Sequence, residues 1–150
     1  MLSKKTKYAL KALVVLADEY EKKEPVLISS LAKRERIPKK FLEVILLELK
    51  NYGVLQSKKG KGGGYFLAKP PGTIKLGTVM RVLEGPLSPL PCLSQTSYQK
   101  CAECVDEETC HVRLIMKDVY EATVKFLDSA TLQDMAERPK RAQLVPMYFI

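Results

Sequence analysis

Residues 58–68, KKGKGGGYFLA, place three lysines beside four glycines and return at once to aromatic and aliphatic residues. The adjoining runs, VLQSKK and GYFLAK, are rich in branched and aromatic residues, which is typical of short strands. The tip lacks the Gly-Lys-Ser/Thr ending of a nucleotide-binding loop, and its apolar flanks distinguish it from a linker. The segment therefore predicts a β-hairpin with a basic tip whose glycines allow close approach to another molecule.

Two segments with helical periodicity lie well ahead of this hairpin. Residues 4–20 repeat apolar side chains at helical spacing with lysines between them, which predicts a helix. Pro25 ends this unit. A short amphipathic helix is predicted at about 29–35, where Ser29 or Ser30 is placed to cap its N-terminus.

A third helix, PKKFLEVILLELKNYG, directly precedes the hairpin. It is predicted to begin with Pro38 at its first position, where a missing N–H costs no intrahelical bond, and Gly53 supplies a left-handed C-terminal stop. Helix, short helix, tight turn and helix is the order of a helix-turn-helix, and a hairpin directly after it makes a winged helix. The predicted fold class is therefore mainly α with a small β-hairpin. The side chains expected to be buried on this helix are Phe41, Leu42, Ile45, Leu46 and Leu49.

The net charge of +8 is concentrated in one half of the chain. Residues 1–72 contain 16 Lys/Arg and 7 Asp/Glu, a balance of +9, whereas residues 73–150 contain 9 and 10, a balance of −1. This asymmetry is expected when one end of a protein binds a polyanion. A solvated, lysine-rich surface is the alternative.

The 150 residues are about one domain's worth of chain, long enough for a hydrophobic core. No apolar run approaches the ~18 residues that span a membrane. The basic start of the chain resembles a signal peptide only superficially, because Lys11 interrupts the apolar stretch and no small-residue cleavage site follows. A cytoplasmic protein that does not bind membranes is expected.

Residues 73–150 contain two further helical patterns. TIKLGTVMRVLEG at 73–85 predicts a short helix, and HVRLIMKDVYEATVKFL predicts a helix of about five turns. The longer helix is apolar over more than one face, so one face is expected to pack on its own domain and the other on a partner subunit; burial inside a monomer is the alternative. Its main stripe is Val112, Ile115, Met116, Val119, Ala122 and Phe126, widened by Leu114, Tyr120, Val124 and Leu127.

The chain resembles the Rrf family of bacterial winged-helix transcription regulators, the IscR/NsrR/CymR group. Three segments carry the resemblance, in the family's order over residues 1 to about 135: LSKKTKYALKAL, ISSLAKRERIPKKFLEVILLELKNYGVLQSKKGKGGGYFLAK and TIKLGTVMRVLEG. The GGGY of the wing and the F/Y-L-E of the third helix are its most specific motifs. The resemblance implies a homodimer that binds a palindromic operator in double-stranded DNA.

The resemblance places Pro38, Lys40 and Glu43 where the family's recognition helix meets base edges. Glu43 can accept a hydrogen bond from a cytosine amino group, and Lys40 can donate to guanine or to a phosphate, whereas Pro38 offers only apolar contact. An exposed carboxylate without a DNA role is the alternative for Glu43. Lys59 lies where family members insert a basic wing residue into the minor groove. The full set expected to bind DNA is Lys4, Ser29, Pro38, Lys39, Lys40, Glu43, Lys58, Lys59, Lys61, Gly62, Gly63 and Tyr65.

All four cysteines lie within nineteen residues, spaced Cys92-x8-Cys101-x2-Cys104-x5-Cys110. In a cytosolic chain such a group is more typical of metal binding or redox sensing than of structural disulfides. The segment from 86 to 110 contains prolines and no strong periodicity, so it is expected to be a loop that can fold around a metal. All four cysteines are therefore candidate metal ligands.

The resemblance implies an iron–sulfur cluster, because iron–sulfur members of the family use three cysteines in this loop, the last two five residues apart as here. Cys92 is the natural first ligand. For the fourth, Cys101 is preferred over His111, which is expected to be the polar start of a helix. Arg113 replaces a histidine that some members use. Cluster binding by thiolates competes with a four-cysteine zinc site and with a metal-free thiol switch.

The favoured function is a dimeric, sequence-specific transcription regulator, a repressor, that senses iron–sulfur status, oxidants or nitric oxide. The same regulator with zinc or a thiol switch is the alternative. A redox enzyme built on Cys101 and Cys104 is disfavoured, since no thioredoxin-like strand and helix surround them, and no catalytic residues are predicted. The expected organisation is a DNA-binding domain at 1–72, a helix, cysteine loop and dimerisation helix within 73–135, and a tail at 136–150 with no assigned function.

Overall fold

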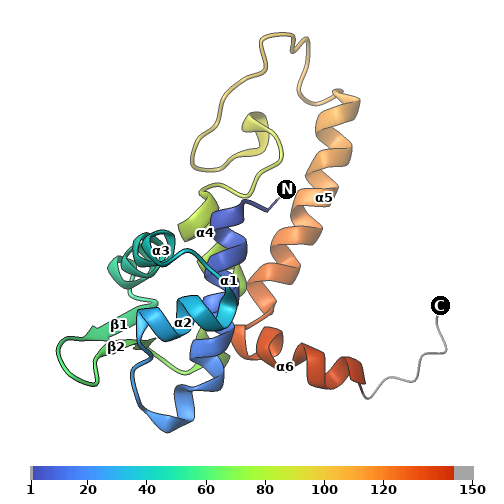
Figure 1. The fold of residues 1–150 in the computed structure, drawn as a ribbon. Coiled ribbons are helices and arrows are strands. Elements are labelled where there is room, and N and C mark those ends of the chain that lie inside the picture. The colour runs from blue at the N-terminus through green and yellow to red at the C-terminus, as the bar shows by residue number, and fades with distance from the viewer. Residues whose placement is uncertain (1, 144–150) are drawn as a thin grey trace.

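The computed structural model describes residues 2–143 of the chain. In chain order its main elements are α1 (Lys4–Asp18), α2 (Ile28–Glu35), α3 (Lys39–Asn51), β1 (Leu55–Lys58), β2 (Gly64–Leu67), α4 (Leu76–Glu84), α5 (His111–Ser129) and α6 (Leu132–Gln143). Figure 1 shows α1–α4 and the hairpin gathered into one body, with α5 along its side and the segment before α5 projecting past its end. This is the predicted winged helix, with the long helix attached to it.

The start of α2 is determined by a contact across the domain. Val26 exchanges two backbone hydrogen bonds with Tyr65 of β2, each 2.9 Å long. Leu27 consequently remains extended as the N-cap residue, and no side chain caps the helix. The prediction that Ser29 or Ser30 caps α2 is therefore wrong; both residues lie inside its first turn.

The turn between α2 and α3 is tight and contains no glycine. Arg36 takes a left-handed conformation with φ of 56°, and the N–H of buried Ile37 donates to the carbonyl of Ala32 at 2.9 Å. Pro38 is the N-cap residue of α3, so the helix begins at Lys39, one residue later than predicted. Gly53, with φ of 78°, confirms the predicted left-handed stop.

The core lies between α1, α2, α3 and the hairpin, and α4 and α6 contribute further residues to it. Phe41 does not belong to it: the ring is 38% exposed and meets the ring of Tyr8 edge-on, with centroids 5.7 Å apart. The prediction that Phe41 is buried is wrong because its position lies at the edge of the apolar face of α3. The core residues include Ala9, Ala12, Leu13, Leu16, Leu31, Leu42, Ile45, Leu46, Leu49, Leu55, Leu67, Val79 and Leu132.

The hairpin confirms the predicted strand–turn–strand. Strands β1 and β2 are antiparallel, with Leu55 opposite Leu67 and Lys58 opposite Gly64. Both leucines are buried, so one end of the hairpin is fixed in the core. The other end carries the lysine- and glycine-rich tip away from the body (Figure 1).

Helices α4 and α5 confirm the two patterns predicted after the hairpin, but α6 was not predicted. Leu132 at its start is fully buried, its N–H donates to the Ile74 carbonyl at 2.8 Å, and α6 packs on α1. The expected boundary at 135/136 falls inside this helix, and residues 144–150 of the expected tail lie outside the described range. None of the described helices has the length and apolar character needed to cross a membrane.

Candidate nucleic-acid interface and cysteine site

The residues of α3 predicted to contact DNA lie together at its N-terminal end. Pro38, Lys39, Lys40 and Glu43 are all exposed, while the opposite face of the helix is buried in the core. Ser29, in the first turn of α2, is also exposed. The helix-turn-helix therefore presents the start of α3 outward, the orientation in which a recognition helix enters a major groove.

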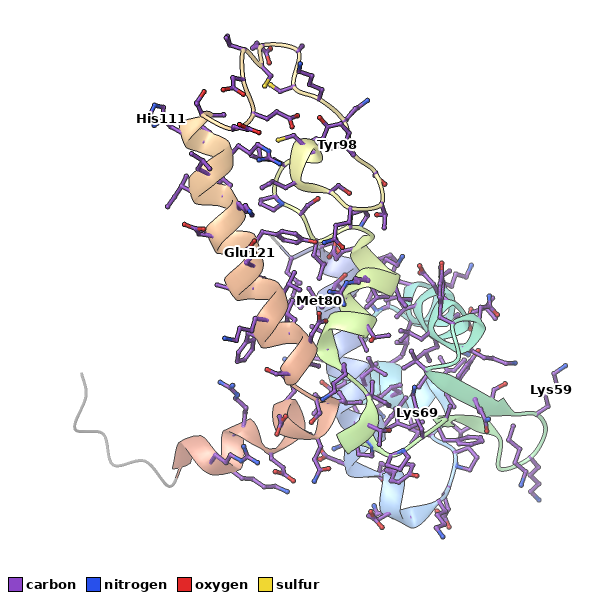
Figure 2. The ribbon with its side chains drawn as sticks, turned by 180° about the vertical axis from the view of Figure 1, so that it is seen from behind. Lys59, Lys69, Met80, Tyr98, His111 and Glu121 are labelled. Carbon is purple, nitrogen blue, oxygen red and sulfur yellow. The ribbon has the colours of Figure 1, made fainter. Side chains whose placement is uncertain are left out.

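The wing adds a second basic surface. Lys58, Lys59 and Lys61 are all exposed around the hairpin tip. Figure 2 shows Lys59 at the far end of the hairpin, extending away from the body. Lysines in this position can neutralise phosphates on either side of a groove.

The glycines of the wing differ in what they do. A Cβ at Gly63 would overlap the carbonyl oxygen of Lys58, and one at Gly64 would overlap that of Val26. Gly62, with φ of 74°, has open space around it. Gly63 and Gly64 therefore shape the hairpin from within, and Gly63 is buried. The importance of Gly64 was missed, although the run of three glycines pointed to a close backbone approach.

Tyr65 and Lys4 lie at the margins of the predicted interface. The side chain of Tyr65 is half-buried and packs against the core. Its backbone pairs with Val26, so this residue helps to hold the hairpin on the domain. Lys4 is exposed in the first turn of α1, and the adjacent Lys5 forms an ion pair with Glu48 of α3. Glu48 lies in the C-terminal half of α3, so this ion pair does not place Lys4 beside the exposed start of that helix.

All four cysteines line a single cavity of about 930 Å³ at the N-terminal end of α5. The cavity lies in the segment that projects beyond the body, where Figure 2 marks Tyr98 and His111. Cys101 is exposed and the other three cysteines are partly buried. The chain therefore collects every thiol it has at one place, where α5 begins.

Cys110 is the N-cap residue of α5. Its sulfur accepts the N–H of Arg113 at 3.5 Å, in the role that a serine or aspartate oxygen usually takes. His111 is the first residue of the helix, which confirms its predicted place. One residue thus belongs both to the wall of the cysteine cavity and to the end of the long helix.

Cys101 makes a different contact. Its thiol donates to the carboxylate of Glu103 at 2.9 Å, and this bond raises the pKa of Cys101 above its ordinary value and lowers the pKa of Glu103. The Cys104 N–H donates to the Cys101 carbonyl at 3.1 Å, which closes a tight turn between the two thiols. Metal binding at Cys101 would have to displace the proton now held between sulfur and Glu103.

The donor set of the cavity fits an iron–sulfur cluster in its chemistry, since soft thiolates are the ligands that such clusters use. Within residues 2–143, however, no three Cys, His, Asp or Glu side chains lie close enough to hold a metal ion. Arg113 also lines the cavity, and its Nε is buried without a hydrogen-bond partner among the described residues. The segment would therefore have to draw its sulfurs together on binding, as metal sites commonly do.

Helix α5 exposes one apolar row. Val112, Ile115, Val119 and Phe126 are 59%, 60%, 48% and 52% exposed, respectively. A second row faces the chain's own domain and is half-buried: Met116, Tyr120, Val124 and Leu127. Met116, expected in the main stripe with Val112 and Ile115, belongs to this inner row. Near the C-terminal end, Arg81 of α4 holds α5 through a two-pronged ion pair with Asp128, at 2.7 and 3.0 Å.

A helix-turn-helix followed by a basic wing, with both presented outward, defines a winged-helix DNA-binding protein. Comparison with known proteins narrows this class. Residues 2–138 match the model of the Rrf2 family, described as an iron-dependent transcriptional regulator.

Relatives match over nearly the whole chain. The rrf2-like HTH-type transcriptional regulator of Rhodobacter capsulatus is 44% identical over 137 residues, which cover 90% of this chain and 91% of that one. The solved structure of CymR, the global cysteine regulator of Bacillus subtilis, has a TM-score of 0.76 at 30% identity, over 92% of this chain and 97% of its own. The T. potens IscR structure has a TM-score of 0.74 at 29% identity, over 99% and 94%. The chain belongs to the Rrf2 family of DNA-binding transcriptional regulators.

Proposed function

We propose that the protein is a homodimeric repressor that binds a palindromic operator and changes its DNA affinity with the state of the cysteine segment. Family membership carries the DNA binding. The finer statement rests above all on one observation: the four cysteines line one cavity, and one of them, Cys110, is the N-cap residue of α5. A regulator that works on chromosomal DNA is expected in the cytoplasm.

The exposed row of α5 supports the dimer. None of the 19 residues of this helix is buried. Valine, isoleucine and phenylalanine side chains therefore form an exposed apolar row along it. A second copy of the same helix packed on this row would remove that apolar surface from water. The two-fold axis of such a dimer would present two α3 helices to successive major grooves, about 34 Å apart, which requires a palindromic operator.

Repression follows from where such a dimer would lie. Two recognition helices and two wings together would cover more than a turn of the duplex, and a promoter covered in this way is closed to RNA polymerase. We therefore expect the operator to overlap a promoter, with expression rising when the protein leaves the DNA.

An iron–sulfur cluster is the proposed cofactor. Cys92, Cys104 and Cys110 would hold it, with Cys101 as the fourth ligand. When bound, such a cluster supplies reactivity toward oxidants and nitric oxide. The chain's own contribution is mechanical: Cys110 can act as ligand and as helix cap, so a rearrangement of the segment would shift the start of α5 and, through the dimer, the spacing of the α3 helices.

A thiol switch is the second candidate, and the turn between Cys101 and Cys104 favours it. The backbone hydrogen bond from Cys104 to Cys101 keeps the two residues close in the chain's fold. An oxidant such as a peroxide would take two electrons and two protons from the thiols as a disulfide forms. A structural zinc on the four cysteines would leave the same DNA-binding domain in place.

Selection of bound fragments from a random-sequence DNA pool tests operator binding and dimerisation together. The selected sites should be palindromic, and binding should weaken steeply as salt rises, because phosphate contacts dominate the affinity. Sedimentation should show a dimer in the absence of DNA. If the protein retains DNA fragments without sequence preference, the proposal of operator binding is wrong. If it is a monomer that selects an asymmetric site, the proposal of a dimer is wrong.

A further inference from the structure

The outward face of α3 carries apolar side chains among its charged ones. Lys40, Val44 and Leu47 follow the four- and three-residue spacing that places side chains in one row along a helix. Val44 is 61% exposed and Leu47 is 50% exposed. The row lies opposite the buried face of the helix, so these two side chains are presented to whatever α3 contacts.

The charge around the row favours DNA as its occupant. Lys39 and Lys40 lie in the first turn of α3, and the three wing lysines are exposed on the neighbouring hairpin. Two such faces would repel each other as copies of one chain, whereas each would attract a phosphate backbone. In the major groove, the apolar group that an aliphatic side chain can contact is the C5-methyl group of thymine.

Val44 is better placed than Leu47 for such a contact. Recognition helices meet base edges with their N-terminal residues, and Val44 lies about one turn beyond Lys40 whereas Leu47 lies nearly two. Valine is also stiff at χ1 in a helix, so it loses little rotamer freedom when it is packed against a base.

We propose that Val44 is a specificity-determining residue that packs against the C5-methyl group of a thymine and thereby selects an A·T pair in each half-site. This inference rests on the proposed operator binding and deepens it. The selected pair would neighbour the one contacted by Lys40 or Glu43, because those side chains lie next to Val44 on the same face of α3.

Deoxyuridine substitution tests the contact directly, because uracil pairs as thymine does and lacks only the methyl group. Each thymine of a selected half-site is replaced in turn, and affinities are measured at fixed salt for the wild type, Val44→Ala and Leu47→Ala. One replacement should weaken the wild type about fourfold per half-site, the value expected for one buried methyl group. In Val44→Ala the same replacement should change affinity less than about twofold, while Leu47→Ala should keep the full effect.

The outcomes separate this inference from the function on which it rests. If the wild type selects no DNA sequence, operator binding and the thymine contact both fail. If it selects a palindrome that has no invariant thymine, or none whose methyl group matters, only the role of Val44 fails. The role of Val44 would also be excluded if deoxyuridine weakened binding equally in Val44→Ala and the wild type. It would likewise be excluded if Leu47→Ala were the only variant in which deoxyuridine had no effect. Because Val44 is exposed, circular dichroism of Val44→Ala should match the wild type.

Discussion

Glu84 joins the end of α4 to the start of α1. The hydroxyls of Ser3 and Thr6, together with the Ser3 N–H at 2.9 Å from Oε1, lower the pKa of this carboxyl to about 2. Thr6 is fully buried, so the bonds lie at the margin of the core. A carboxyl whose pKa is depressed in the folded state contributes stability that is present above its ordinary pKa of 4.5 and is lost as pH falls toward 2.

We therefore expect Glu84→Gln to be less stable than the wild type at neutral pH, by about 1 kcal/mol. The difference in free energy of unfolding should stay constant above about pH 5 and shrink as pH falls from there toward about 2, because the wild-type carboxyl then becomes protonated. Urea unfolding at a series of pH values measures it. A difference that does not change with pH would show that the charge of Glu84 has no part in its contribution.

Gly64 is the position at which the wing tolerates least change. A Cβ there would overlap the Val26 carbonyl oxygen, which accepts the Tyr65 N–H. We expect Gly64→Ala to lower the free energy of unfolding by about 2 kcal/mol or more, because the hairpin must separate from Val26 to admit the methyl group. Gly62→Ala is the matched control: it meets no atom within 4 Å and should cost only the strain of a positive φ, about 1 kcal/mol. Equal losses in the two variants would contradict this account.

At the scale of elements, helix α5 has two faces with different partners. The inner row packs on α4 and the body, and the outer row of Val112, Ile115, Val119 and Phe126 is exposed. Arg138 of α6 lies over the ring of Phe126, 5.7 Å from its centroid. The outer row therefore continues toward α6, and a partner seated on it would approach both helices.

Ile115→Glu should dissociate the proposed dimer. A carboxylate at the centre of the outer row would lose its water in the interface without gaining a counter-charge, which costs several kcal/mol, so the dimer dissociation constant should rise roughly 100-fold. Glu121→Lys is the control, since this exposed residue lies on the polar side of the same helix. Sedimentation equilibrium distinguishes the variants. A dimer that survives Ile115→Glu would exclude the outer row as its interface.

The elements that could be predicted from the sequence are those whose signals are local. The apolar period of α1, α3, α4 and α5 and the left-handed Gly53 sufficed to place the winged helix. The start of α2 could not be placed, because the pairing of Val26 with Tyr65 joins segments far apart in the chain. Helix α6 was missed although Thr131 and Asp134 cap each other at its start, because Pro139 lies inside it and a proline in a helix interior usually ends or kinks the helix.

The candidate DNA-binding and cysteine sites also contain features that could be predicted from the sequence and features that could not. Spacing and residue type identified the four cysteines as one group, and the structure shows them around one cavity. The start of α5 at His111 and the buried face of α3, which excludes Val44, were both predicted from helical periodicity. That the Cys110 sulfur accepts the Arg113 N–H was not predicted, because it depends on a side-chain conformation that the order of the residues does not determine.

At the scale of the whole molecule, the two halves of the protein meet in α5. The DNA-binding body holds the C-terminal end of this helix through Arg81 and Asp128, and the cysteine segment holds its N-terminal end through Cys110. The outer row lies between these two ends. A change in the cysteine segment could therefore reach the recognition helices by moving α5 or by altering how two copies of it pack in the proposed dimer.

Two substitutions at Cys110 separate its roles as ligand and helix cap. Cys110→Ser keeps an oxygen that can accept the Arg113 N–H, whereas Cys110→Ala does not, so the alanine variant should be less stable by about 0.5–1 kcal/mol. Both remove the thiolate, so we expect both to lack the iron and acid-labile sulfide that the proposal predicts for wild-type protein purified without oxygen. The DNA affinity of Cys110→Ser should then stay the same in every redox state.

The results of this comparison distinguish the possible sensors. Iron and sulfide retained by Cys110→Ala would exclude Cys110 as a ligand, because alanine offers no donor atom. Zinc in the wild type would show that the cysteines hold a structural metal instead of a cluster. If metal-free Cys110→Ser still responds to an oxidant, the sensor is a thiol switch among Cys92, Cys101 and Cys104. A third outcome is that Cys110→Ala loses DNA affinity while Cys110→Ser keeps the affinity of the wild type. The hydrogen bond that caps α5 would then position this helix for DNA binding, and no metal would be needed.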